Sequence, residues 1–252
     1  TSSCIESILN STNSNFKIIL VDNESDNKKV KSFKYRNEIK IIRNKENEGF
    51  SKANNIGIDY ALKNNYDYTI LINNDTRVEK HLIEVLLKTA QAKNFSVVQP
   101  LILKYNDKEI WNAGGRINYF FGNFITRKKV DNSLNSSHEL TEWLSGCCCL
   151  FKTKIFKEIG KLDESFFAYY EDVDFSLRLK KHGYKIGFTS KTHVYHYESF
   201  SSISNNSKGG KLSPYIHYLN IRNHILILKK HSDLFNPFGT RLYQIFKIIS
   251  YS

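Results

Sequence analysis

The chain has 252 residues, of which 40% are hydrophobic and 25% are charged. This composition is ordinary for a globular protein and argues against an intrinsically disordered chain. The length provides for one large domain or two small ones. The net charge of +12 favours an anionic partner, such as nucleic acid, a phosphate-bearing substrate or an acidic membrane face. No stretch approaches the roughly 20 consecutive apolar residues of a transmembrane helix.

The first half of the chain alternates apolar runs with amphipathic segments. Helical spacing places Ala53, Ile56 and Tyr60 on the inner face of the first amphipathic segment. The pattern predicts strands over residues 16–25, 38–44, 67–73 and 95–103, and helices over residues 49–65 and 79–94. Strands alternating with helices of this length are typical of an α/β fold with a mostly parallel sheet.

The second half is less regular. Residues 143–160 have a strand-then-helix pattern, and a helix is predicted from Glu171 to a stop at Gly183. A polar loop rich in Ser, Gly and Asn follows, and then a basic, aliphatic segment to the last residue. We find no repeat and no interdomain linker, so we predict one domain over residues 1–223 and a basic amphipathic tail over residues 224–252.

Polar side chains follow two of the predicted strands at the point where each strand ends. Asp22 ends the first strand, and Asn73, Asn74 and Asp75 follow the third. In α/β sheets the ligand crevice lies outside the carboxyl ends of the strands. A carboxylate with amide or phosphate oxygens suits a hard divalent cation. Asp and Asn are also good turn residues. Each segment taken alone therefore fits either a turn or a ligand site.

Five motifs in one order resemble the family 2 glycosyltransferases, which have the GT-A fold, and in particular the bacterial rhamnosyltransferase-type members. The resemblance covers roughly residues 7–223, most of the chain. The motifs are VDNES at residues 21–25, NEGFSKANNIG at residues 47–57, NND at residues 73–75, WLSG at residues 143–146, and EDVD at residues 171–174 followed by His196.

The resemblance implies a mostly parallel central sheet flanked by helices, and an inverting glycosyltransferase. Such an enzyme moves a sugar from a nucleotide-diphosphate donor, of the dTDP-rhamnose or UDP-hexose type, to a surface-polysaccharide or lipid-linked glycan. It implies Mg²⁺ or Mn²⁺ as cofactor and a cytoplasmic location, at the inner face of the cell membrane. The tail can lie on an anionic membrane surface as a basic amphipathic segment or pack on the domain as a helix.

The resemblance also implies roles for single residues. Asp22 would bind the base of the nucleotide, and Asp75 would hold the metal, with Asn73 standing where many relatives have Asp. His196 is favoured over its neighbour His193 as the second metal ligand, against the alternative of a buried structural histidine. The residues assigned to the nucleotide sugar are Asp22, Asn23, Asn47, Gly49, Asn55, Asn73, Asn74 and Gly146. The cysteine run at residues 147–149 is expected to pack, because no base is placed beside it.

An inverting transfer needs a carboxylate that takes the proton from the acceptor hydroxyl. On the predicted helix Asp172 shares a face with Phe175, whereas Asp174 faces Arg178 and forms an ion pair. We therefore predict Asp172 as the catalytic base, with its pKa raised by partial desolvation, and Glu171 as the other candidate catalytic residue. The alternative is that all three carboxylates only cap and solvate the helix.

Two other classes fit parts of the sequence, a catalytically inactive glycosyltransferase-like binding module and a basic nucleic-acid-binding protein. Acidic residues at the strand ends would repel a phosphodiester chain, so we predict no nucleic-acid partner. Relatives begin with an apolar strand before the helix that residues 3–11 match. Without that strand, the chain is expected to be a fragment that lacks part of the nucleotide pocket.

Overall fold

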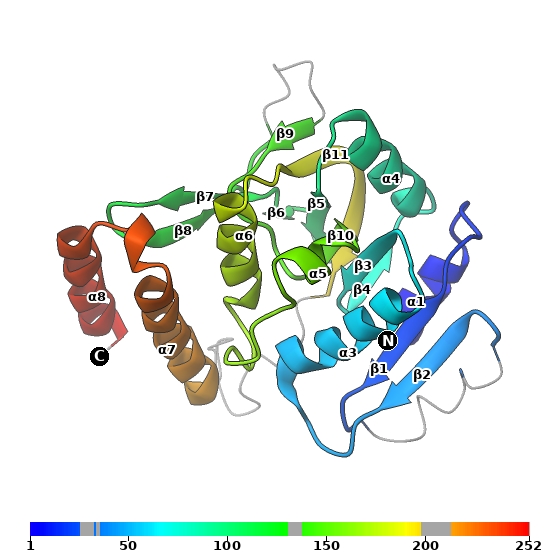
Figure 1. Ribbon diagram of the computed structural model, residues 1–252, viewed down its shortest axis with the longest axis horizontal. Coiled ribbons are helices and arrows are strands. Elements are labelled where there is room, and N and C mark those ends of the chain that lie inside the picture. The colour runs from blue at the N-terminus through cyan, green and yellow to red at the C-terminus, as the bar shows by residue number, and fades with distance from the viewer. Residues whose placement is uncertain (26–32, 34–35, 131–137, 198–212, 252) are drawn as a thin grey trace.

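Helices cover both faces of a central sheet in the computed structural model (Figure 1), which describes residues 1–25, 33, 36–130, 138–197 and 213–251. The polar loop predicted after Lys191 falls largely in residues 198–212, outside the described residues. The helices are α1 (Ser2–Leu9), α3 (Gly49–Lys63), α4 (Leu82–Ala92), α5 (Ile155–Glu158), α6 (Glu171–Lys181), α7 (Pro214–Lys230), the 3-10 turn η2 (Ser232–Leu234) and α8 (Pro237–Tyr251). The strands are β1 (Ile18–Asp22), β2 (Ile39–Arg43), β3 (Tyr68–Ile72), β4 (Thr76–Val78), β5 (Val97–Lys104), β6 (Ile110–Asn112), β7 (Gly115–Asn118), β8 (Asn123–Thr126), β9 (His138–Leu140), β10 (Cys148–Lys152) and β11 (Ile186–His196).

The largest sheet has the order β3-β10-β5-β11-β4, with β6 beside β5 and β9 beside β11. Strand β10 pairs antiparallel with both β3 and β5, and β11 pairs parallel with β5. Strands β3, β5 and β11 therefore run in one direction, with β10 inserted between two of them. The predicted α/β class is confirmed, and the sheet is mixed because β10 and the short strands run against this direction.

Strands β1 and β2 form a separate parallel pair, in which Ile18 lies opposite Ile39 and Asp22 lies opposite Arg43. Within the described part of the chain, β1 pairs only with β2, and β3 has β10 as its one strand partner. Helix α3 contacts both β1 and β3, so one helix packs against the separate strand pair and against the main sheet.

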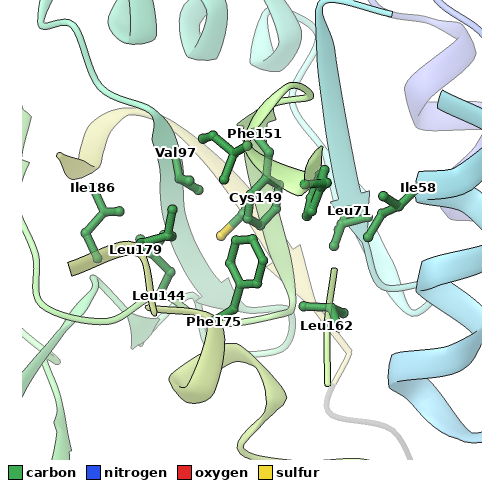
Figure 2. Packing of buried hydrophobic residues seen from close by; sticks show 12 residues of the cluster. Ile58, Leu71, Val97, Leu144, Cys149, Phe151, Leu162, Phe175, Leu179 and Ile186 are labelled. Carbon is green, nitrogen blue, oxygen red and sulfur yellow. The ribbon is translucent and has the colours of Figure 1, made fainter. Parts of the chain in front are cut away.

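The cysteine run illustrates how the sheet separates two cores. Successive strand residues point to opposite faces, so Cys149 joins the core with α3, α5 and α6, and Cys148 joins the core with α1 and α4. Figure 2 shows Phe175 and Leu179 of α6 beside Cys149 on the first of these faces. The thiols act as small apolar side chains, as predicted, because both faces of β10 are covered.

Helix α6 is buried on two sides. Phe175 and Leu179 pack against the sheet, while Val173 and Leu177 pack against Ile227 of α7 and its neighbours. This double burial explains why apolar residues occupy alternate positions in a segment that is helical. The acidic first turn and basic last turn favour the helix dipole, and the predicted stop at Gly183 is confirmed by its φ of 72° just beyond the helix.

The tail folds as two helices. Ser213 caps α7 through Ile216 N, and Pro214 occupies the first turn, which are common residues at a helix start. The predicted boundary between residues 223 and 224 falls inside α7, and the division into a domain and a tail stays a prediction. The β7–β8 hairpin reaches toward α7 and α8 (Figure 1). No helix among the described residues has the length and apolar character needed to span a bilayer.

Acid should destabilise the protein through His224. The side chain of His224 is buried, its Nε2 lies 2.8 Å from the Gly122 carbonyl oxygen, and burial, together with the charge of Lys247, lowers its pKa to about 4. The unfolded chain binds this proton at its ordinary pKa near 6.5. Stability is therefore full above about pH 6.5 and falls, by roughly 3 kcal/mol in total, as the pH drops to about 4.

Urea unfolding between pH 7 and pH 4 tests this prediction. The variant His224→Gln lacks the titrating group, so its free energy of unfolding should fall less steeply than that of the wild type. His81→Gln, which alters an exposed histidine, is the control and should keep the wild-type slope. Equal slopes for all three proteins would contradict the assignment.

Candidate active site

Gly146 and Cys147 connect the turn at residues 73–75 with the start of α6. The backbone N–H of Asn73 donates to the Cys147 carbonyl oxygen at 2.9 Å, and the N–H of Gly146 donates to Asp172 Oδ2 at 2.8 Å. Burial raises the pKa of Cys147 well above its usual range, and the carboxylates of Asp75 and Asp172 both add to the effect. Asp75 and Asp172, which are distant in sequence, therefore both lie near these two residues.

Asp75 lies beside His196, as predicted. Strand β4 pairs with β11 so that Thr76 lies opposite His196, and the distance from His196 Nε2 to Asp75 Oδ1 is 3.4 Å. The indole of Trp111 packs edge-on against the His196 ring, with the ring centroids 4.7 Å apart. His193, in contrast, lies with its Nδ1 3.1 Å from Glu79 Oε2. His196 and not His193 thus lies beside Asp75, and its role as a metal ligand stays a prediction.

Asp75 and His196 fit a divalent cation that is shared with a substrate. The Nδ1 of His196 is buried and has no hydrogen-bond partner among the described residues. No group of three or more His, Cys, Asp or Glu side chains suited to a metal occurs in the described part of the chain. Mg²⁺ is commonly held by one or two protein ligands together with phosphate oxygens, so this pair suits a cation bound together with a diphosphate.

The turn at residues 73–75 has a fixed backbone. The Asn73 carbonyl oxygen accepts from the Thr76 hydroxyl at 2.7 Å and lies 3.5 Å from the Cys4 thiol. The Asn74 side chain is exposed and donates to the Thr1 hydroxyl at 3.2 Å. Direct contacts of Asn73 and Asn74 with a nucleotide sugar stay predictions. The backbone bonds show that the turn holds Asp75 in place through its neighbours.

Asp22 is buried at the end of β1, and its two oxygens differ. Oδ1 accepts from both the backbone N–H and the hydroxyl of Ser25, at 2.9 and 2.5 Å. Oδ2 lies 3.5 Å from Arg43 Nε and accepts no hydrogen bond from the described residues. The second oxygen thus has a fixed orientation and spare capacity to accept a hydrogen bond, and its contact with a nucleotide base stays a prediction.

Asn23 and Asn47 bind each other in the loop before α3. Asn23 donates to Asn47 Oδ1 at 2.8 Å and accepts from the N–H of Glu48 at 2.9 Å. Gly49 follows with a φ of 80°, and a Cβ there would lie 2.6 Å from Phe167 atoms, so only glycine fits. These residues shape the turn, and their contact with the donor stays a prediction.

Asn55 is a brace between α3 and the segment before α6. Its Nδ2 donates to the Leu162 carbonyl oxygen at 2.9 Å and to Glu164 Oε1 at 2.8 Å, while its Oδ1 accepts from Leu162 N–H at 3.0 Å. These bonds use both donors of the amide. The structure therefore gives Asn55 a supporting role, and the nucleotide contact that the resemblance implies would require these bonds to be exchanged.

The three carboxylates at the start of α6 have three different environments. Asp174 forms the predicted ion pair with Arg178, at 2.8 Å. Burial alone would raise its pKa, but His231, Arg178 and Lys230 together lower the pKa of Asp174 to about 2. It is consequently a structural anion at neutral pH, and the catalytic candidates reduce to Glu171 and Asp172.

Asp172 is the better oriented of the two candidates. Its Oδ2 accepts from Gly146 and its Oδ1 from Val173 N–H, both at 2.8 Å. Burial raises the pKa of Asp172 although these two N–H groups oppose the shift. Glu171 is buried, its Oε2 accepts no hydrogen bond from the described residues, and burial, together with the charge of Asp172, raises its pKa well above the usual range.

A small, mostly apolar cavity of about 20 Å³ lies next to these carboxylates. It lies beside Gly146, Glu171 and Asp172, and the rest of its wall is mostly apolar, including Phe50 and Phe175. A cavity of this size holds about one water molecule. Asp172 is half-buried with an apolar wall next to its carboxylate, which agrees with the predicted partial desolvation.

The family assignment follows from the sequence itself. Residues 2–160 match the sequence profile of Glycosyl transferase family 2. The chain belongs to this family. The hexosyltransferase Agl10 of low-salt glycan biosynthesis in Haloferax volcanii is 27% identical over 182 residues, covering 68% of this chain and 55% of the relative. The dTDP-rhamnosyl transferase RfbF of Shigella flexneri is 23% identical over 222 residues, covering 86% of the chain and 72% of the relative.

Solved structures share the fold. A crystal structure of GalNAc-T7 with UDP, GalNAc and Mn²⁺ superposes with a TM-score of 0.71 at 16% identity, over 90% of this chain and 44% of that one. TarS of S. aureus in complex with UDP-GlcNAc gives 0.58 at 18% identity, over 90% of this chain and 62% of that one. The predicted GT-A type fold is confirmed. The chain spans just over half the length of the Haloferax relative.

Sequence reasoning missed several residues that support the site. Trp111, which packs on His196, lies in an irregular segment without periodicity. Cys4 contacts the Asn73 carbonyl oxygen from α1, and Arg222 with Asn223 contacts the segment before α6 from α7. The only sequence signal for Arg222 and Asn223 was a pair of adjacent polar residues in a segment rich in aliphatic residues.

Removing Asp75 should remove the response to metal. In the wild type we expect Mn²⁺ to strengthen binding of a nucleoside diphosphate by about tenfold or more, because one charge-assisted contact contributes about 1.5–3 kcal/mol. In Asp75→Ala this gain should vanish when binding is measured by calorimetry with and without EDTA. Glu79→Gln alters the neighbouring His193 pair and should keep the gain. Equal binding in EDTA and Mn²⁺ by the wild type would refute the metal site.

Proposed function

We propose that the protein is an inverting glycosyltransferase, which transfers a sugar from a nucleotide-diphosphate donor to a glycan hydroxyl. The observation that carries the proposal is the arrangement around Gly146 and Cys147. One residue binds the carboxylate of Asp172, and the next binds the turn that holds Asp75. A candidate base and a turn that carries a candidate metal ligand thus both contact one short segment, as a displacement at an anomeric carbon requires.

In the proposed reaction Asp172 takes the proton from the acceptor hydroxyl as that oxygen attacks the anomeric carbon. The bond between the anomeric carbon and the diphosphate oxygen breaks, the nucleoside diphosphate leaves with the electron pair, and the configuration inverts. Mg²⁺ or Mn²⁺, held by Asp75 and His196, would neutralise the charge on the leaving diphosphate. Asp22 orients the nucleotide through its base, and the N–H of Gly146 keeps the Asp172 carboxylate directed at the hydroxyl.

The proposed substrates follow the names of the relatives. A dTDP-rhamnose donor agrees with the name of the Shigella protein, and a nucleotide-hexose donor, such as a UDP-hexose, agrees with the hexosyltransferase name of the Haloferax protein. A surface-polysaccharide or lipid-linked acceptor agrees with a further relative, the N-acetylglucosaminyl-diphospho-decaprenol L-rhamnosyltransferase of Mycobacterium tuberculosis, 36% identical over 69 residues, which are 27% of this chain and 22% of that protein. A panel of nucleotide sugars, read by released diphosphate, tests the donor class, and binding without turnover of any donor would favour a binding module.

Replacing the base should abolish transfer but spare donor binding. Asp172→Asn keeps the size of the side chain but cannot accept the proton, so transfer should fall by roughly 10²–10⁴-fold with donor affinity retained. Because the base works deprotonated and its pKa is raised, wild-type kcat should fall with acid at a pH above the usual carboxyl range. Near-normal transfer by Asp172→Asn, with collapse in Glu171→Gln, would move the role to Glu171.

We also propose that the protein works in the cytoplasm at the inner face of the membrane, with α8 on the lipid surface. One face of α8 exposes Phe238, Leu242, Ile245 and Phe246, by 72, 51, 57 and 66%. The charged residues of this helix that lie within Pro237–Tyr251 are Arg241 and Lys247, both basic. An apolar stripe with basic neighbours suits an anionic lipid surface, where a lipid-linked acceptor would be found.

Two matched substitutions test this location. Leu242 on α8 and Leu140 on β9 are both exposed, by 51 and 63%, and the elements α8 and β9 lie on different parts of the molecule (Figure 1). Leu242→Glu should lower co-sedimentation with phosphatidylserine vesicles by about tenfold, since burying a leucine contributes about 1.5–3 kcal/mol. Leu140→Glu should bind as the wild type does. Failure of the wild type to co-sediment at low salt would end the membrane proposal.

A further inference from the structure

The segment between α5 and α6 is held by side chains from three helices. Its backbone carbonyl oxygens accept hydrogen bonds that a surface loop usually makes with water. Arg178 of α6 binds the carbonyls of residues 159–161, Asn55 and Ser51 of α3 bind those of residues 162 and 166, and Arg222 and Asn223 of α7 bind those of residues 165, 168 and 169. This segment leads directly into Glu171 and Asp172, so its shape sets where α6 begins.

The last two residues of the segment are in an unfavourable backbone conformation. Tyr169 and Tyr170 have φ angles of 70° and 71°, in the left-handed region. Residues with a Cβ adopt this region at a cost, and two in succession are rare. Such a conformation persists only where surrounding contacts enforce it. The same contacts set the backbone direction at the start of α6 and therefore the position of the Asp172 side chain.

Asn223 of α7 contacts this strained pair directly through Tyr169. Its side chain is completely buried, and its Nδ2 donates to the carbonyl oxygens of Ala168 and Tyr169, both at 2.8 Å. Its Oδ1 accepts from Arg222 Nη1 at 2.7 Å, so the orientation of the amide is fixed. Both donors of one amide therefore hold the two peptide groups on either side of Tyr169.

We propose that Asn223 is a positioning residue for catalysis, which holds Tyr169 and Tyr170 in their left-handed conformation and thereby directs Asp172 at Gly146. The inference rests on the proposed function in one respect, that Asp172 is the base. Without the amide, Tyr169 can relax to a negative φ, which turns the start of α6 and draws Asp172 away from the Gly146 N–H.

The remainder of α6 is anchored separately. Asp174 binds Lys230 and His231 at 2.7 and 2.9 Å, and Val173 and Leu177 pack on α7. Loss of the Asn223 amide should therefore disturb the first residues of α6 while the body of the helix stays in place. This separation distinguishes a positioning role from a general contribution to folding.

The test compares Asn223→Ala with Asn220→Ala. Asn220 lies on the same helix, but its amide donates to Ile216 in its own helix, at 2.9 Å. We expect kcat to fall by about 10²-fold in Asn223→Ala, the size of effect that misplacing a catalytic group by about 1 Å produces, with donor Kd unchanged. Asn220→Ala should behave as the wild type. Adding Tyr169→Gly to Asn223→Ala should restore much of kcat, because glycine adopts positive φ freely.

A second measurement works without turnover. The N–H of Gly146 is bonded to Asp172, so its hydrogen exchange reports where that carboxylate lies. It should exchange faster in Asn223→Ala and at the wild-type rate in Asn220→Ala. If the wild type transfers no sugar, the proposed function fails while this readout still decides the placement. Unchanged Gly146 exchange, or a loss of protection throughout α6 that Tyr169→Gly does not reverse, would overturn the positioning role.

Discussion

The arrangement of the site depends on the ion pairs of the buried Asp174 carboxylate. It lies between Arg178 on its own helix and Lys230 and His231 at the end of α7. Breaking a buried ion pair by removing one partner costs about 3–5 kcal/mol, because the remaining charge is left without compensation. Since Arg178 also binds the carbonyls before α6, one anion joins the catalytic helix, the segment that precedes it and α7.

Local chemistry in the sequence was enough to predict much of this. The Asp174–Arg178 pair is four residues apart on a helix, and such pairs can be read from spacing. The strand ends were predictable because an apolar run stops abruptly at Asp22 and at Asn73. Asp172 could be separated from Asp174 by the helix face it shares with Phe175. Each of these predictions needs only neighbours within one helix or strand.

Other features depend on partners that are distant in sequence. Periodicity predicted Ala53, Ile56 and Tyr60 on the inner face of α3, yet the structure leaves them only half-buried. The residues it buries include Ser51 and Asn55, on the opposite side of the helix. These two polar side chains are buried because carbonyls more than 100 residues away accept their hydrogen bonds. The insertion of β10 between β3 and β5, and the continuation of α7 through the predicted domain boundary, are likewise set by tertiary pairing that hydrophobic pattern does not encode.

The four cysteines have a practical consequence. All four thiols are reduced and buried, and burial raises the pKa of Cys148 far above the physiological range. Only the thiolate reacts with alkylating agents. The buried thiols of β10 and its neighbour should therefore not react until the sheet opens. Three of the thiols lie in or next to β10, which has a neighbouring strand on each side, and opening of such a core strand needs a large free energy. The rate of thiol modification would thus measure how often the sheet opens, without any introduced label.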